Sequence, residues 1–225
     1  MAEIAVALDL ATARDALALA DRLPGLRWVK IGPVLFVREG PALVRACRER
    51  GLHVFLDLKC HDIPSTVAGA VTAARELGVT MATVHCLGGP RMLEAAVRAA
   101  GDLALVGVTV LTSHDGADFA EVLGRGVPDV AWEAERLARA ALRAGLRGVV
   151  ASGQELSLLR EALGREPWLV VPGIRLPGDP VGDQMRVIEP EQAVRLGATH
   201  LVVGRSITAA DDPVRAWRRL QEVVT

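Results

Sequence analysis

At 225 residues, 51% of them apolar, the chain can bury one substantial core, and we expect residues 1–225 to form a single domain. Its 26 basic and 27 acidic residues nearly cancel, which argues against a nucleic-acid partner, because proteins that bind a phosphate backbone usually carry a strongly basic face. No apolar stretch reaches the roughly 20 residues that cross a bilayer, and the start, MAEIAVALDL, lacks the basic residues of a signal peptide, so we expect a cytoplasmic protein without a membrane partner.

Eight short apolar runs are predicted to be strands, and segments of helical periodicity separate them. In chain order, the strands are expected at 4–10, 27–32, 53–59, 81–85, 103–112, 148–152, 168–173 and 200–205. Between them lie segments such as 11–23 and 130–145, whose apolar residues recur every three or four positions, as on a helix that lies against a sheet. Eight such repeats predict a parallel sheet covered by helices, and their number favours a (βα)8 TIM barrel over an open doubly wound sheet.

Charged residues stand at the predicted ends of the first three strands. In a barrel of this type, functional side chains gather at the C-terminal ends of the strands. Asp9 ends the first strand, Lys30 the second, and Asp57 and Lys59 the third. Because side chains alternate with period two, Asp57 and Lys59 should point the same way, with the other two beside them. This cluster fits an active site or an ion-pair network that stabilises the barrel mouth.

Lysine is almost absent from the chain. Lys30 and Lys59 are the only lysines among 26 basic residues, and both follow apolar strands beside carboxylates. An amine can release its proton when it is buried, whereas a guanidinium holds its proton at any accessible pH. Drift within an arginine-rich composition is the alternative explanation, but the shared position of the two lysines favours a chemical role.

The ends of the seventh and eighth strands predict a phosphate site. VVPGIR and VVGR place Gly173, Gly204 and Arg205 there, and the loop-like LPGDPVGDQ lies between them. The loops after strands seven and eight of such barrels frequently hold a phosphate on backbone N–H groups, and an arginine adds a charge-assisted clamp. An ordinary turn would explain either glycine alone, so the combination with Arg205 carries the prediction.

Together these segments resemble the orotidine 5'-phosphate decarboxylase family. The matching stretches, from residue 7 to residue 205, are ALDL, VKIG, FLDLKCHDIPST, TVHCLGG, VTVLTS, VPGIR, GDQ and VVGR. The most specific is Asp-x-Lys-x-x-Asp-Ile-Pro-x-Thr at 57–66. The resemblance implies a barrel enzyme that removes CO2 from C6 of orotidine 5'-phosphate and leaves uridine 5'-phosphate, the last step of pyrimidine nucleotide synthesis. It also implies that no metal or organic cofactor takes part.

The resemblance assigns the chemistry to five charged residues. Lys59 is the implied proton donor to C6, held between Asp57 and Asp62. Lys30 ties the acids together, and Asp9 completes the array near the sugar. In this arrangement, Asp57 faces the carboxylate of the substrate.

Further residues are implied to hold the substrate. The implied contacts are Asp9, Lys30, Ile63, Thr66, Thr112, Ser113, Pro172, Arg175, Gln184, Gly204 and Arg205. Ser113, with Thr112, reads the pyrimidine edge, and Pro172 helps to wall that pocket. Gln184 and Arg205 hold the phosphate beneath a closing loop at 175–184. Some family members add a tyrosine to the phosphate site, and this chain has no tyrosine, so that contact is absent or replaced.

The family also implies a homodimer. Asp62, Ile63 and Thr66 are assigned to the active site of the partner subunit. Full activity would therefore require two copies of the chain.

Two other functions remain open. A Mg2+-dependent barrel, such as a sugar-phosphate decarboxylase or a hexulose-phosphate synthase, shares the Asp-x-Lys-x-x-Asp pattern but carries further acidic metal ligands, and HDIPST and VTVLTS favour the pyrimidine nucleotide instead. A catalytically silent sensor could keep only the phosphate site, but retention of both lysines argues against it.

The histidines and cysteines do not predict a metal site or a disulfide. His61 has no partner at metal-ligand spacing, so we expect a local hydrogen-bonding role for it, and we expect His85 to order the barrel mouth. Cys47, Cys60 and Cys86 are odd in number and irregularly spaced, so we expect reduced thiols, with Cys60 filling space beside the motif.

Overall fold

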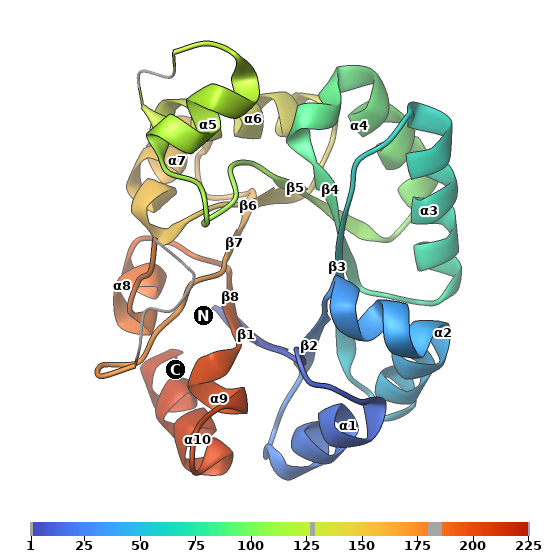
Figure 1. Ribbon diagram of the computed structural model, residues 1–225, viewed down its shortest axis with the longest axis vertical. Helices are drawn as coiled ribbons and strands as arrows, with labels where there is room; N and C mark the ends of the chain where they lie inside the picture. The colour runs from blue at the N-terminus through green and yellow to red at the C-terminus, as the bar shows by residue number, and fades with distance from the viewer. Residues whose placement is uncertain (1, 127–128, 180–185, 225) are drawn as a thin grey trace.

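Eight parallel strands close into a barrel in the order β1 to β8, and helices surround it, so the predicted (βα)8 architecture is confirmed (Figure 1). The computed structural model describes residues 2–126, 129–179 and 186–224. The strands are β1 (Glu3–Ala7), β2 (Trp28–Ile31), β3 (His53–Cys60), β4 (Met81–His85), β5 (Ala104–Val108), β6 (Gly148–Val150), β7 (Trp168–Val171) and β8 (His200–Val203).

The helices form the outer layer of the molecule. In chain order they are α1 (Ala13–Arg22), α2 (Pro33–Glu49), α3 (Pro64–Glu76), α4 (Gly89–Ala100), α5 (Gly116–Leu123), α6 (Val130–Arg143), α7 (Leu156–Leu163), α8 (Pro190–Arg195), α9 (Arg205–Thr208) and α10 (Pro213–Val224), with short 3-10 turns η1 (Cys86–Gly88) and η2 (Gly153–Glu155). The two helices predicted from periodicity are α1 and α6. They begin where Thr12 and Asp129 accept hydrogen bonds from the backbone N–H groups of the first turn.

All eight predicted strands exist, but several end earlier than predicted. The first strand ends at Ala7 rather than at residue 10, and the fifth ends at Val108 rather than at residue 112. Strand β6 has only three residues, so the β5–β6 pairing stops at Val108 and Val150. Leu8 and Val110, beyond these ends, are buried in loops at the mouth of the barrel, which explains why the apolar runs exceed the strands.

Two apolar layers hold the barrel together. The larger layer lies between the strands and the helices, and the smaller one fills the barrel interior with Ala5, Ala7, Trp28, Phe55, Met81, Val106, Val170 and Val202. At the N-terminal end of the barrel, the His200 ring packs against Trp28 and Trp168, with ring centroids 5.2 and 4.6 Å away. Burial lowers the pKa of His200 to about 4, so this imidazole is neutral at neutral pH. These side chains fill the N-terminal end of the barrel. The open space lies at the C-terminal end of the strands.

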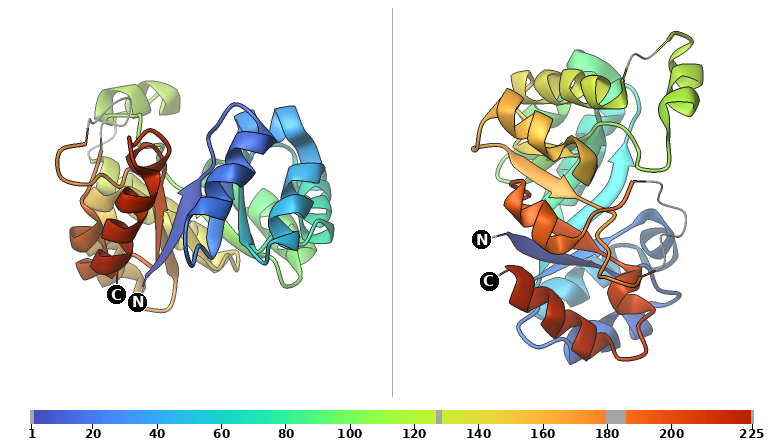
Figure 2. Two further views of the ribbon diagram at one scale, coloured as in Figure 1. Left: turned by 90° about the horizontal axis from the view of Figure 1, so that it is seen from below. Right: turned by 90° about the vertical axis from the view of Figure 1, so that its left-hand side faces the viewer.

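Strands β1 and β8 close the ring. Glu3 pairs with His200, and the start of β1 and the end of α10 lie side by side in both views of Figure 2. Helix α5 stands out from the ring at the C-terminal side of the strands in the right-hand view (Figure 2). Among the described residues, no helix is both long and apolar enough to cross a membrane.

Candidate active site

A cavity of about 440 Å³ opens at the C-terminal ends of the strands. Its volume is of the size that holds a small molecule. Its lining comes from the strands and from the segments that follow them, and Lys30, Asp57 and Lys59 lie on β2 and β3 themselves. The charged side chains in the lining are Asp9, Lys30, Asp57, Lys59, Arg175 and Arg205.

Two lysines and two aspartates alternate along one side of this cavity, as expected from their positions. Lys59 Nζ lies 2.9 Å from Asp57 Oδ2. Lys30 Nζ lies 3.8 Å from the same carboxylate oxygen and 3.3 Å from Asp9 Oδ1. The side chains of Lys30 and Asp57 are only 10% and 13% exposed, so each buried charge depends on its neighbours of opposite sign.

An irregularity in β3 presents Lys59 to the cavity. The pairing of β3 with β4 shifts register between Leu56 and Cys60. Lys59 has a φ of 51°, and it is the only non-glycine residue with positive φ among those the structure describes. This backbone conformation costs about 1–3 kcal/mol, and such strained residues tend to cluster at functional sites.

Thr83, in the middle of β4, fixes this conformation. Its Oγ1 accepts a hydrogen bond from the backbone N–H of Lys59 at 2.8 Å and donates one to Asp57 Oδ1 at 3.1 Å. The hydroxyl therefore holds both members of the Lys59–Asp57 ion pair. Sequence reasoning missed Thr83 because it considered only the end of this strand, although a threonine within an apolar strand of a barrel is itself a signal.

Gly32, directly after β2, leaves the space in which Asp9 and Lys30 meet. A Cβ at this position would lie 2.9 Å from Asp9 Oδ1 and 3.1 Å from Lys30 Nζ. Any side chain would therefore push the pair apart. The glycine of the VKIG segment thus has a physical explanation that its sequence position alone did not supply.

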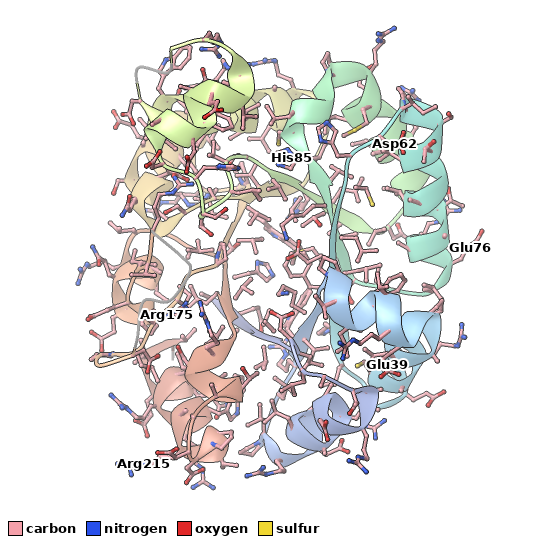
Figure 3. All side chains as sticks on the ribbon, in the orientation of Figure 1. Glu39, Asp62, Glu76, His85, Arg175 and Arg215 are labelled. Atoms are coloured by element: carbon pink, nitrogen blue, oxygen red, sulfur yellow. The ribbon has the colours of Figure 1, made fainter. Side chains whose placement is uncertain are left out.

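Residues after β7 and β8 line the opposite side of the cavity. They are Pro172, Gly173, Arg175, Gly204 and Arg205. Gly173 has a φ of 78°, a conformation that favours glycine. Arg175 is buried, and it extends from the β7 side toward the barrel centre (Figure 3). Residues 180–184, the second half of the expected loop at 175–184, lie outside the described residues, and Gln184 is one of them.

Three of the predicted site residues lie away from this cavity within one chain. Asp62, Ile63 and Thr66 are exposed, and Asp62 lies at the outer edge near the start of α3 (Figure 3). The Asp62 carboxylate accepts a hydrogen bond from its neighbour, Ile63 N, at 2.6 Å. Of the two acids expected around Lys59, one chain brings only Asp57 into contact with it.

Thr112 and Ser113, the two residues expected to contact the pyrimidine edge, differ in their position relative to the cavity. Thr112 lines the cavity, whereas Ser113 lies outside the lining. Both lie in the loop after β5, because that strand ends at Val108.

His85 and His61 stack beside the site, with ring centroids 5.4 Å apart. His85 Nδ1 accepts a hydrogen bond from Leu87 N at 3.3 Å and so caps the turn η1 that follows β4. The local hydrogen bond expected for His61 is not seen among the described contacts, and its ring packs on His85 instead. Burial, together with the nearby His61 and Lys59, lowers the pKa of His85 to about 4, so this ring is neutral at neutral pH.

The cysteines are unpaired, as expected. Cys47 and Cys86 are buried, and Cys60 is partly buried against the core. Burial raises the pKa of Cys86 to about 12, so this thiol is protonated and unreactive. Among the described residues, no three His, Cys, Asp or Glu side chains gather as metal ligands would.

Comparison with known proteins places this geometry in a family. Residues 2–220 match the model of the family described as orotidine 5'-phosphate decarboxylase / HUMPS. The orotidine 5'-phosphate decarboxylases of Halorhodospira halophila and Alkalilimnicola ehrlichii are each 50% identical to this chain, over 95% and 96% of it and 92% and 93% of their own lengths. The solved structure of orotidine 5'-phosphate decarboxylase from Lactobacillus acidophilus superimposes with a TM-score of 0.88 at 32% identity, covering 100% of both chains. The chain therefore belongs to the orotidine 5'-phosphate decarboxylase / HUMPS family.

Proposed function

We propose that this chain decarboxylates orotidine 5'-phosphate to uridine 5'-phosphate, a step of pyrimidine synthesis, and that Lys59 protonates C6 without help from a cofactor. The family and the names of its half-identical relatives support the reaction. The observation that carries the mechanism is the alternating array of Asp9, Lys30, Asp57 and Lys59 in the main cavity.

The array suits the difficulty of this reaction. When the bond between C6 and the carboxylate breaks, CO2 leaves and the electron pair stays on C6 in the plane of the ring. There it cannot spread into the π system. A fixed ammonium stabilises this anion electrostatically and then gives it a proton. Lys59 is the candidate, because its ion pair with Asp57 at 2.9 Å holds the ammonium in position.

Repulsion between Asp57 and the substrate carboxylate makes a smaller contribution. Two like charges about 4 Å apart repel by roughly 4 kcal/mol at an effective dielectric of 20. Enzymes can lower a barrier by up to about 23 kcal/mol, so relief of this repulsion is a minor share. We therefore assign most of the effect to preorganised stabilisation of the anion by Lys59.

The opposite side of the cavity is assigned to the rest of the nucleotide. Arg205, Gly204 and Arg175 line this side, and Arg205, the backbone of Gly204 and Arg175 are proposed to hold the phosphate. Gln184, which lies outside the described residues, is proposed to join them. Binding energy collected there can be used to orient the base at the reacting end. Thr112 and Ser113 are proposed to form hydrogen bonds with the edge of the pyrimidine, and Pro172 is proposed to pack beside the base.

A homodimer is also proposed, with Asp62, Ile63 and Thr66 entering the partner's cavity. These residues are exposed at the C-terminal end of β3 and lie outside their own cavity. Ile63 is 63% exposed, and Val34 and Val37, at the start of α2 after the neighbouring strand β2, are 63% and 83% exposed. Exposed apolar side chains at two adjacent strand ends are suited to cover by a second copy of the chain.

Turnover of orotidine 5'-phosphate tests the activity and the role of Lys59. The purified protein should consume the substrate, followed by its absorbance, and Lys59→Ala should lower kcat at least about a thousandfold, because it removes both the proton donor and the main positive charge. An unchanged melting temperature would show that the variant folds. Full turnover by Lys59→Ala would refute the mechanism.

The same assay separates the two other candidate functions. EDTA should leave the rate unchanged, whereas a Mg2+-dependent sugar-phosphate enzyme would need the metal and would not consume this substrate. A silent sensor would bind uridine 5'-phosphate and show no turnover.

A further inference from the structure

A buried ion pair lies beside the main cavity without lining it. Arg186 and Glu155 are 8% and 1% exposed, and Arg186 Nη1 donates a hydrogen bond to Glu155 Oε1. Arg186 Nη2 also donates to the carbonyl oxygens of Val110 and Leu111, at 3.3 and 2.9 Å. Val110 and Leu111 do line the cavity, next to Thr112. The guanidinium thus binds the backbone of the loop after β5 from outside the cavity.

Glu155 anchors this pair to the end of β6. Its Oε2 accepts a hydrogen bond from Ser152 N at 2.8 Å, and the two residues form a capping box around η2. Because η2 follows β6 directly, the carboxylate has little freedom to move.

Arg186 is connected to the loop after β7 through the backbone of Ile188. Two residues beyond Arg186, Ile188 N donates to Gly173 O at 3.1 Å, and Arg175 N donates to Ile188 O at 3.0 Å. Ile188 also packs tightly on Gly153, where a Cβ would lie 2.6 Å from Ile188 Cβ. Residues 186–188 therefore connect the backbone of three cavity loops, those that follow β5, β6 and β7.

Stability alone is a weak reason for this arrangement. Burying two charges costs about as much as their attraction returns, and apolar replacements of such pairs are often at least as stable. Arg186 Nε is moreover buried without a hydrogen-bond partner among the described residues, which adds to the cost. What the pair does supply is a fixed spacing between loops that meet the substrate at two different places.

We propose that Arg186 and Glu155 are positioning residues that hold the loop 110–112 at a fixed distance from the loop 173–175. The inference rests on the proposed function, in which these loops meet the pyrimidine and the phosphate. Phosphate binding can assist the chemistry at C6 only if the two loops are rigidly connected, since a misplacement of about 1 Å can cost a hundredfold in rate.

Comparison of two substrates tests this role. The double variant Arg186→Met/Glu155→Gln leaves no unpaired buried charge, and the amide oxygen of the new side chain still accepts from Ser152 N. We expect its kcat/KM for orotidine 5'-phosphate to fall about tenfold to a hundredfold, which is the range for lost hydrogen bonds from a charged donor. Its kcat/KM for orotidine, which has no phosphate to couple, should change less than about threefold. Arg186→Lys keeps the ion pair but not the planar fork, so it should fold and give an intermediate loss with the phosphorylated substrate.

A buried ion pair elsewhere supplies the control. Glu133 on α6 is fully buried and paired with Arg125 and Arg136, and it does not line the cavity. Glu133→Gln should lower the melting temperature and leave both kcat/KM values within about threefold of wild type.

The outcomes separate this inference from the proposed function. With an active wild type, equal losses for both substrates, or no loss for either, would overturn the positioning role alone. An inactive wild type would overturn both proposals.

Discussion

At the scale of single residues, the site depends on backbone geometry as much as on charge. Lys59 carries the ammonium, but its positive φ is unfavourable for a lysine. The Thr83 hydroxyl offsets this cost by accepting the Lys59 N–H and donating to the Asp57 carboxylate. One neutral side chain thus fixes both the backbone that presents the amine and the acid that pairs with it.

Replacing Thr83 by valine should therefore lower kcat with little change in KM. The variant keeps the shape of the side chain and removes a hydrogen bond to a charged group, which is worth about 1.5–3 kcal/mol, so we expect a tenfold to hundredfold loss. Thr83→Ser, which restores the hydroxyl, should recover most of the rate. Steady-state kinetics with orotidine 5'-phosphate would measure both variants.

Thr109 provides the matched control for this experiment. It is equally buried, but its hydroxyl donates to the backbone carbonyl of Val150 at 3.0 Å, and it does not line the cavity. Thr109→Val should cost stability and leave kcat nearly unchanged. If Thr83→Val were as active as Thr109→Val, the hydroxyl would have no part in holding Lys59.

The charged residues of the site were predictable from the sequence, but their supports were not. Asp9, Lys30, Asp57 and Lys59 follow from their place at strand ends, because parallel strands bring their carboxyl ends together. Thr83 and Gly32 became visible only once the register of β4 and the path after β2 were known. Sequence spacing shows which residues share an end of the barrel, not which atoms meet there.

At the scale of elements, the sequence predicted the order and type of the strands better than their ends. An apolar run marks burial, and burial continues past β5 into Val110, which lines the cavity from a loop. Strand ends depend instead on pairing with both neighbours, and β6 limits this pairing to three residues on either side. The length of one strand is therefore set by another that is distant in sequence.

The short strand β6 also gives a prediction about stability. A Cβ on Gly148 would overlap the carbonyl oxygen of Trp168 and lie 2.6 Å from Trp168 Cβ, so the backbone of β7 would have to move. Gly148→Ala should lower the free energy of unfolding by about 2–3 kcal/mol, as overpacking of a core does. Urea denaturation would measure the change.

Gly69 on α3 is the control for the same substitution. It is exposed, and a Cβ there meets nothing within 4 Å. Because alanine favours a helix over glycine, Gly69→Ala should raise the free energy of unfolding by about 0.5–1 kcal/mol. A Gly148→Ala variant as stable as Gly69→Ala would show that β6 and β7 can separate without cost.

At the scale of the whole molecule, the barrel follows from eight similar repeats, whereas the assembly does not. Each βα repeat carries the same apolar pattern, so the closed fold could be predicted from periodicity. The sequence does not show that Asp62, Ile63 and Thr66 are exposed and lie outside the cavity of their own chain, whereas the structure does. The dimer is therefore proposed because the cavity of one chain lacks the three residues that a second chain can supply.

Mixing two inactive variants tests whether the partner completes the site. Lys59→Ala and Asp62→Ala should each be nearly inactive alone, because each removes one member of every shared site. In a mixed dimer, one site loses both residues and the other keeps both. After equal amounts have exchanged subunits at random, half of the dimers are mixed, so about a quarter of the wild-type rate should return. If Asp62 acted within its own chain, no mixed dimer would hold a complete site and the rate would stay at that of the separate variants.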